Sequence, residues 1–85
     1  MASYRLLIKT SAVKEIEALP KTDRRRVVAR IQKLSDDPRP PGSEKLSGHE
    51  QYRVRQRRYR ILYAIEDTDL IVVVVKVGHP RDVSR

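Results

Sequence analysis

The stretch YRVRQRRYRILYAIEDTDLIVVVVKV, residues 52–77, decides the fold. At its start Tyr52 and Val54 alternate with Arg53 and Arg55. Successive side chains of a strand point to opposite faces of the sheet, so this period of two predicts a strand with one buried face. The other face of that strand is basic.

The remainder of the stretch predicts two more strands. A turn at residues 56–58 leads into a strand over 59–65, and the polar segment 66–69 reads as a hairpin loop before a run of Ile and Val over 70–77. A run so apolar on both faces is typical of a strand at the centre of a sheet, with helices covering one side. We therefore expect a three-stranded antiparallel meander.

Upstream of this meander, the pattern indicates one strand and a first helix. Residues 4–9 are rich in Leu and Ile and predict a strand. Thr10-Ser11 offers a hydroxyl cap for an amphipathic helix over 12–19, and Pro20 ends it.

A second helix is predicted to start near Thr22-Asp23, which we expect to cap it, and to run to Ser35. Its apolar stripe consists of Val27, Val28, Ile31 and Leu34. Residues 36–43, DDPRPPGS, contain three prolines and a glycine and predict a surface loop. The expected architecture is α+β: an N-terminal strand, a helical hairpin packed on an antiparallel sheet, and the meander that completes that sheet.

Length and composition limit the classes of protein to consider. The chain has 85 residues, no cysteine and two histidines, so we expect one domain over residues 1–85 without disulfides, metal or cofactor. No signal peptide or membrane span is evident, which favours the cytoplasm and no membrane partner. The formal charge of +8 favours an anionic partner such as RNA, DNA, lipid or an acidic protein.

The candidate functional residues of this sequence are mainly cationic. It contains no Walker loop, dinucleotide fingerprint or catalytic triad motif. Five arginines lie between residues 53 and 60. A ribonuclease that acts without metal needs cations around the phosphorane formed when the 2′-hydroxyl attacks its phosphate, and arginine suits that role. The arginine cluster is therefore the candidate site.

Four motifs together resemble the RelE family of bacterial and archaeal toxins. They are KLSG (residues 45–48), YRVR (52–55), YRILY (59–63) and KVGH (76–79), the last followed by Arg81-Asp82-Val83. The resemblance implies a RelE-like fold and a ribosome-dependent mRNA interferase. Such an enzyme cuts mRNA in the A site and leaves a 2′,3′-cyclic phosphate.

The resemblance also implies roles for individual residues. Arg53 and Arg55 match the basic pair that flanks the scissile phosphate, and Arg60 matches the arginine that holds the transition-state phosphate. Arg81 is the candidate near the leaving oxygen. Ser84 stands where the family has a tyrosine that stacks on the nucleotide, and Pro80 replaces the usual basic residue after the VGH motif.

Three further residues are additional candidates for the site: Lys45, His79 and Ser84. Histidine is a residue type suited to proton transfer, and His79 lies near the expected site, although a histidine after a strand is more often structural. The tyrosines of the meander are more plausible as packing residues of the core than as platforms for base stacking.

The partners implied by the resemblance are the ribosome, mRNA and a cognate antitoxin. We expect the antitoxin to be acidic, to be partly disordered until bound, and to form a higher-order complex that contacts operator DNA through the antitoxin. Two alternatives stay open. One is a ParE-like gyrase inhibitor without nuclease activity, and the other is a degenerate toxin that acts only as an antitoxin-binding module.

Overall fold

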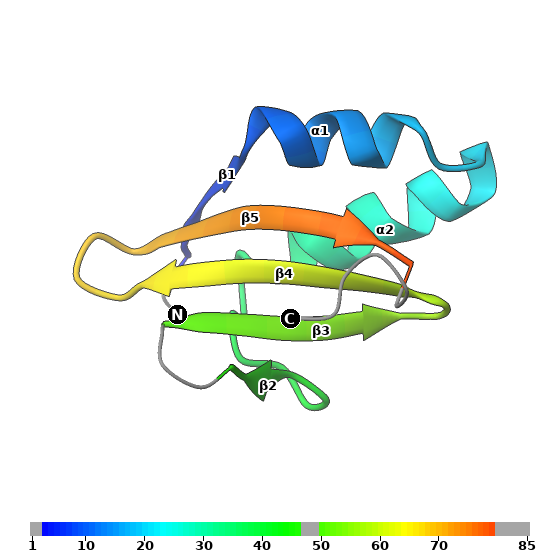
Figure 1. The fold of residues 1–85 in the computed structure, drawn as a ribbon. Coiled ribbons are helices and arrows are strands. Elements are labelled where there is room, and N and C mark those ends of the chain that lie inside the picture. Colours follow the sequence, from blue (N-terminus) through cyan, green and yellow to red (C-terminus); the bar gives the residue numbers. More distant parts are fainter. Residues whose placement is uncertain (1–2, 47–49, 80–85) are drawn as a thin grey trace.

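A computed structural model describes residues 3–46 and 50–79, and it has the α+β architecture that the sequence predicts (Figure 1). Two helices lie on one face of a five-stranded sheet. The elements, in chain order, are β1 (Arg5–Ile8), α1 (Thr10–Glu17), α2 (Lys21–Lys33), β2 (Glu44–Lys45), β3 (Gln51–Gln56), β4 (Tyr59–Glu66) and β5 (Ile71–Gly78).

The strand order is β1-β5-β4-β3-β2, so β4 is the middle strand of the sheet. Strands β3, β4 and β5 form the predicted antiparallel meander. The sheet is not antiparallel throughout, because β1 pairs in parallel with β5 in the register Arg5↔Ile71 to Ile8↔Val74. Strand β2 was not predicted, since two residues are too few to show a period of two.

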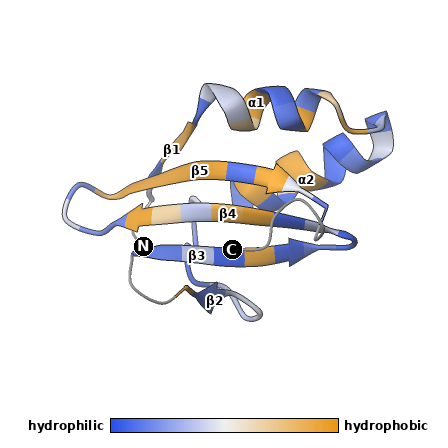
Figure 2. Ribbon diagram, viewed as in Figure 1, coloured by the Kyte–Doolittle hydropathy of each residue, from blue (hydrophilic) through white to orange (hydrophobic). Residues whose placement is uncertain are grey.

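The core lies between the sheet and the helices, where the apolar residues gather (Figure 2). Tyr52 and Val54 are buried there, as their alternation predicts. Val28 does not belong to the core: its side chain is 36% exposed, whereas Val27 is fully buried. One residue turns a helix by about 100°, which carries Val28 out of the buried stripe. The strand residues of the core are Tyr52, Val54, Tyr59, Ile61, Tyr63, Ile65, Val72, Val74 and Val77.

Neither helix begins with the predicted side-chain cap. The N-caps are Lys9 and Pro20, and neither makes a side-chain capping hydrogen bond. Both helices start earlier than the hydroxyl pattern predicts. Asp23 instead accepts a hydrogen bond from the Tyr59 hydroxyl at 2.8 Å, which ties α2 to the start of β4. Within the described segments, no helix is long and apolar enough to cross a membrane.

Strand β5 differs from the predicted apolar run at its start and in its middle. Leu70 belongs to the preceding turn: it has a φ of +55° and is 41% exposed. Further on, Tyr63 pairs with Val74 while Leu62 pairs with Lys76, so Val75 is an extra residue in a β-bulge. The bulge explains why Val74 and Val77, three residues apart, both face the core.

A carboxylate on α1 holds this bulged end of β5. Glu15 accepts a hydrogen bond from the Val77 backbone N–H at 2.9 Å and another from the Lys76 ammonium at 2.7 Å. A buried or half-buried N–H needs such an acceptor, because leaving it without one costs free energy. The helical layer is thereby fixed to the strand next to the candidate site.

Candidate functional site

Three of the predicted site residues meet on the sheet face opposite the helices. Arg55 on β3 lies directly across from Arg60 on β4, and Arg53 is two residues before Arg55 on the same face. These three side chains, with Gly42 and Glu44, line a pocket of about 350 Å³. The predicted grouping of Arg53, Arg55 and Arg60 at one place is thus present in the structure, whereas their catalytic roles remain a prediction.

The pairing of Arg55 with Arg60 is electrostatically unfavourable in isolation. Cβ atoms of directly opposite residues lie about 5 Å apart, and like charges at that distance destabilise a sheet. On the other side of Arg60, strand β5 contributes Gly78, which brings no side chain. A cluster of this kind is stabilised by an anion, and guanidinium groups match the oxygens of phosphate well.

Glu44 is the carboxylate among the residues that line this pocket. It pairs in register with Arg53 across β2 and β3, and its Oε1 accepts hydrogen bonds from Arg53 Nε at 3.2 Å and Nη2 at 2.5 Å. The hydrogen bond and charge of Arg53, with smaller contributions from Arg55 and Arg60, hold the pKa of Glu44 below its usual range. Glu44 was not predicted from the sequence, because a single glutamate in a two-residue strand carries no recognisable pattern.

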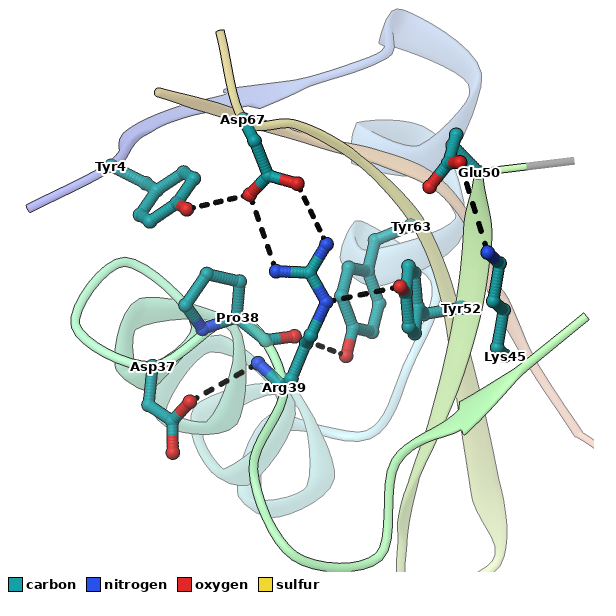
Figure 3. A network of polar contacts seen from close by, with 9 residues as sticks. All are labelled: Tyr4, Asp37, Pro38, Arg39, Lys45, Glu50, Tyr52, Tyr63 and Asp67. Carbon is teal, nitrogen blue, oxygen red and sulfur yellow. Dashed lines mark hydrogen bonds and ion pairs between the residues drawn. The ribbon is translucent and has the colours of Figure 1, made fainter. Parts of the chain in front are cut away.

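The wall of the pocket that contains Gly42 belongs to the loop between α2 and β2. Gly42 has a φ of +92°, a conformation that favours glycine. Upstream in the same loop, Arg39 donates two hydrogen bonds to the Asp67 carboxylate, at 3.2 and 2.8 Å (Figure 3). Tyr4 donates a third to Asp67 at 2.7 Å. The loop is thereby attached to the turn between β4 and β5 and to the start of the chain.

Two core tyrosines form hydrogen bonds with the same loop. Arg39 Nε donates to the Tyr52 hydroxyl at 3.0 Å, and its guanidinium lies 5.1 Å from the centre of that ring. Tyr63 donates to the Pro38 carbonyl oxygen at 2.7 Å and stacks on Tyr52, with ring centres 5.9 Å apart (Figure 3). This confirms that these tyrosines pack in the core, and it shows a positioning role for Arg39 that the sequence did not reveal.

Replacing Asp67 by asparagine is expected to lower the melting temperature at neutral pH. Arg39 and then Tyr4 lower the pKa of Asp67 through their hydrogen bonds, so the folded state favours the ionised carboxylate. The stabilisation is complete above the ordinary carboxyl pKa of about 4 and is lost as the pH falls through the lower folded value. Thermal melts of the wild-type and Asp67→Asn proteins from pH 7 to pH 3 should therefore converge in acid.

The matched control is Asp69→Asn, which makes the same change of charge in the same exposed turn. It should change the melting temperature less than Asp67→Asn does at pH 7. Equal effects of the two substitutions would contradict the role given to the Arg39 and Asp67 pair.

The remaining candidates are not in the arginine pocket or lie outside the described residues. Lys45 is on β2, where its Nζ is 3.7 Å from Glu50 Oε1, and it does not line the pocket. His79 is exposed after β5 and lines a separate pocket that includes Glu15 and Tyr59. Arg81 and Ser84 lie outside the described residues. The described part of the chain holds no group of three His, Asp or Glu side chains arranged for a metal ion.

Comparisons with known proteins point to one family. Residues 6–83 match the family model of the ParE toxin of the type II toxin-antitoxin system parDE. An Escherichia coli protein whose name likens it to the RelE toxins is 27% identical over an alignment of 77 residues, and the match covers 88% of this chain and 81% of that protein.

Two solved structures share the fold. The archaeal RelE-RelB complex from Pyrococcus horikoshii matches with a TM-score of 0.82 and 29% identity over 91% of this chain and 94% of the other. The intact RelBE toxin-antitoxin complex of Escherichia coli matches with a TM-score of 0.79 and 29% identity over 91% and 96%. This chain belongs to the RelE/ParE family of toxins from type II toxin-antitoxin systems.

Proposed function

We propose that this toxin is a metal-independent endoribonuclease that cleaves mRNA in the ribosomal A site. The observation that carries the proposal is the set of Arg53, Arg55 and Arg60 around one pocket on the open face of the sheet. Like charges held opposite each other in this way suit the binding of a phosphate, which gains negative charge in the transition state.

In the proposed reaction, the ribose 2′-oxygen attacks the adjacent phosphorus while the bond to the 5′-oxygen breaks. The products are a 2′,3′-cyclic phosphate and a free 5′-hydroxyl, and the proton of the 2′-hydroxyl leaves as the 5′-oxygen gains one. Arg60 and Arg55 bind the equatorial oxygens of the phosphorane, and Arg53 orients the phosphate between them. From the sequence, we propose that Arg81 acts near the leaving oxygen.

The most direct experiment in cells is a brief induction of the toxin followed by mapping of new RNA 5′ ends. An mRNA interferase should produce new 5′ ends within translated codons. The alternative is a gyrase inhibitor, which the description of the matching family model as ParE favours. That activity would cause DNA damage and loss of plasmid supercoiling with no new RNA ends. A module that binds only its antitoxin would produce neither effect.

Cleavage is expected to depend on the ribosome. The arginines supply charge for phosphate contacts, but guanidinium groups have too high a pKa to be effective bases. The mRNA must therefore be presented with its 2′-hydroxyl already aligned, and the A site is a place that imposes such alignment. Purified toxin should cut ribosome-bound mRNA rapidly and the same deproteinised mRNA poorly, with or without EDTA. Equal rates on the two substrates would disprove ribosome dependence.

The cognate antitoxin is expected to silence the toxin and to stabilise it. We propose an acidic segment that is disordered when free and folds on the toxin, with carboxylates that pair with Arg53 and Arg55. Complexes with RelB antitoxins among the similar structures support this proposal. Titrating the product of the neighbouring gene should raise the melting temperature and reduce cleavage in parallel. An antitoxin that stabilises the toxin and leaves cleavage unchanged would refute occlusion of the site.

A further inference from the structure

The anion pocket already contains an anionic group from the chain itself. The Glu44 carboxylate contacts two nitrogens of the Arg53 guanidinium through one oxygen, and the backbone register of β2 and β3 places the two residues opposite each other. The Arg53 side chain is 23% exposed, whereas that of Glu44 is 64% exposed. Both side chains line the pocket, so the ion pair forms part of its wall.

A phosphate that enters the pocket needs the same N–H groups. Carboxylate and phosphate oxygens both bind the guanidinium edge, and Nε and Nη2 of Arg53 cannot donate fully to both at once. We propose that Glu44 acts as an internal competitor for the phosphate site and so determines the affinity of the arginine cluster for its substrate. This inference rests on the proposed function, in which the cluster binds the scissile phosphate.

The surroundings of Glu44 fit such a competitor. A glutamate carboxylate is ionised at neutral pH, and the contacts with Arg53 lower the pKa of Glu44 further, so Glu44 competes as an anion. Arg55 and Arg60 line the same pocket and attract the carboxylate as they would attract a phosphate. Because the Glu44 side chain is exposed, its ion pair with Arg53 costs little to break, and the carboxylate can return to water when a phosphate displaces it.

The competitor also gives the site a preference for ligands that contact several arginines at once. A ligand that contacts one guanidinium gains little by replacing the tethered carboxylate of Glu44, whereas a phosphodiester, which also carries a single negative charge, has two free oxygens that can contact more than one arginine. Glu44 thereby acts as a specificity-determining residue, and it also neutralises part of the like-charge repulsion while the pocket is empty of substrate.

The test is a titration of the free toxin with inorganic phosphate, followed by NMR signals of the arginine Nε–H groups. Glu44→Gln removes the charge but keeps the size and an acceptor oxygen. It should bind phosphate about three- to fivefold more tightly than the wild type, the upper part of the range expected for loss of a competing ion pair at an exposed site. Glu17→Gln, an exposed glutamate at the end of α1, makes the same change in net charge and should alter the affinity by less than about twofold.

The two substitutions separate this inference from the proposed function. Tighter phosphate binding by Glu44→Gln without RNA cleavage by any variant would uphold the competitor and contradict the nuclease. Equal affinities for Glu44→Gln and Glu17→Gln, or weaker binding by Glu44→Gln, would overturn the competitor. Failure of both the wild type and Glu44→Gln to bind phosphate would overturn it as well.

Discussion

Arg60→Ala is expected to reduce cleavage of ribosome-bound mRNA by about a hundredfold or more and to abolish toxicity in cells. Arg60 lies opposite Arg55 and lines the same pocket, and in the proposed reaction it is one of the cations that stabilise the charge developing on the phosphorane. Loss of one such preorganised group costs about 3 kcal/mol of transition-state stabilisation. Single-turnover cleavage on programmed ribosomes measures this effect without interference from product release.

The matched control is Arg5→Ala, which removes the same charge from an exposed residue of β1. Strands β5 and β4 separate β1 from β3 in the sheet. Its cleavage rate should lie within about threefold of the wild-type rate, because the substitution lowers the overall positive charge and leaves the pocket unchanged. The far-ultraviolet circular dichroism of both variants should match that of the wild type. If a folded Arg60→Ala protein were as toxic as the wild type, the catalytic role proposed for Arg60 in the arginine cluster would be wrong.

Tyr63→Ala is expected to lower the free energy of unfolding by about 3–5 kcal/mol, as large aromatic-to-alanine substitutions in a core do. The Tyr63 side chain is fully buried, stacks on Tyr52 and donates to the Pro38 carbonyl oxygen. The free energy of unfolding of native proteins is only about 5–15 kcal/mol, so the variant should be close to unfolded at 37 °C. Urea denaturation measures the change directly.

Tyr63→Phe separates the ring from its hydroxyl. It leaves the Pro38 carbonyl oxygen without this donor and should cost about 1–3 kcal/mol, less than the alanine substitution. Burial raises the pKa of Tyr63 to about 12, so its hydroxyl should stay protonated in the folded protein well above pH 10. Equal losses of stability for Tyr63→Phe and Tyr63→Ala would show that the ring contributes nothing, contrary to the packing observed.

The parts of the fold that depend on local periodicity were predictable. The alternation of tyrosine and valine with arginine in β3 places the basic side chains on the open face, as observed. The parallel pairing of β1 was not predictable, because a short apolar strand carries no signal for its direction. The turn at Leu70 and the bulge at Val75 also depend on tertiary contacts, and both lie in an uninterrupted run of apolar residues.

The candidate site also contains residues that the sequence predicted and residues that it did not. The motif around Arg53, Arg55 and Arg60 predicted that these residues act together, and the strand register brings them to one pocket. Glu44 and Arg39 were missed because each acts through a partner distant in sequence: Glu44 through the β2–β3 register, and Arg39 through Asp67, 28 residues away. An ion pair across such a separation becomes visible only once the topology is known.

We propose that the toxin makes the 2′-hydroxyl of mRNA attack its own phosphate within the ribosome. The most direct measurement uses programmed ribosomes with an mRNA that carries a single 2′-deoxy nucleotide on the 5′ side of the cut. We expect the all-ribose message to be cut to a 2′,3′-cyclic phosphate and a 5′-hydroxyl, and the single deoxy substitution to stop this cut. Cleavage of the substituted message at the same bond and at an unchanged rate would disprove attack by the 2′-hydroxyl.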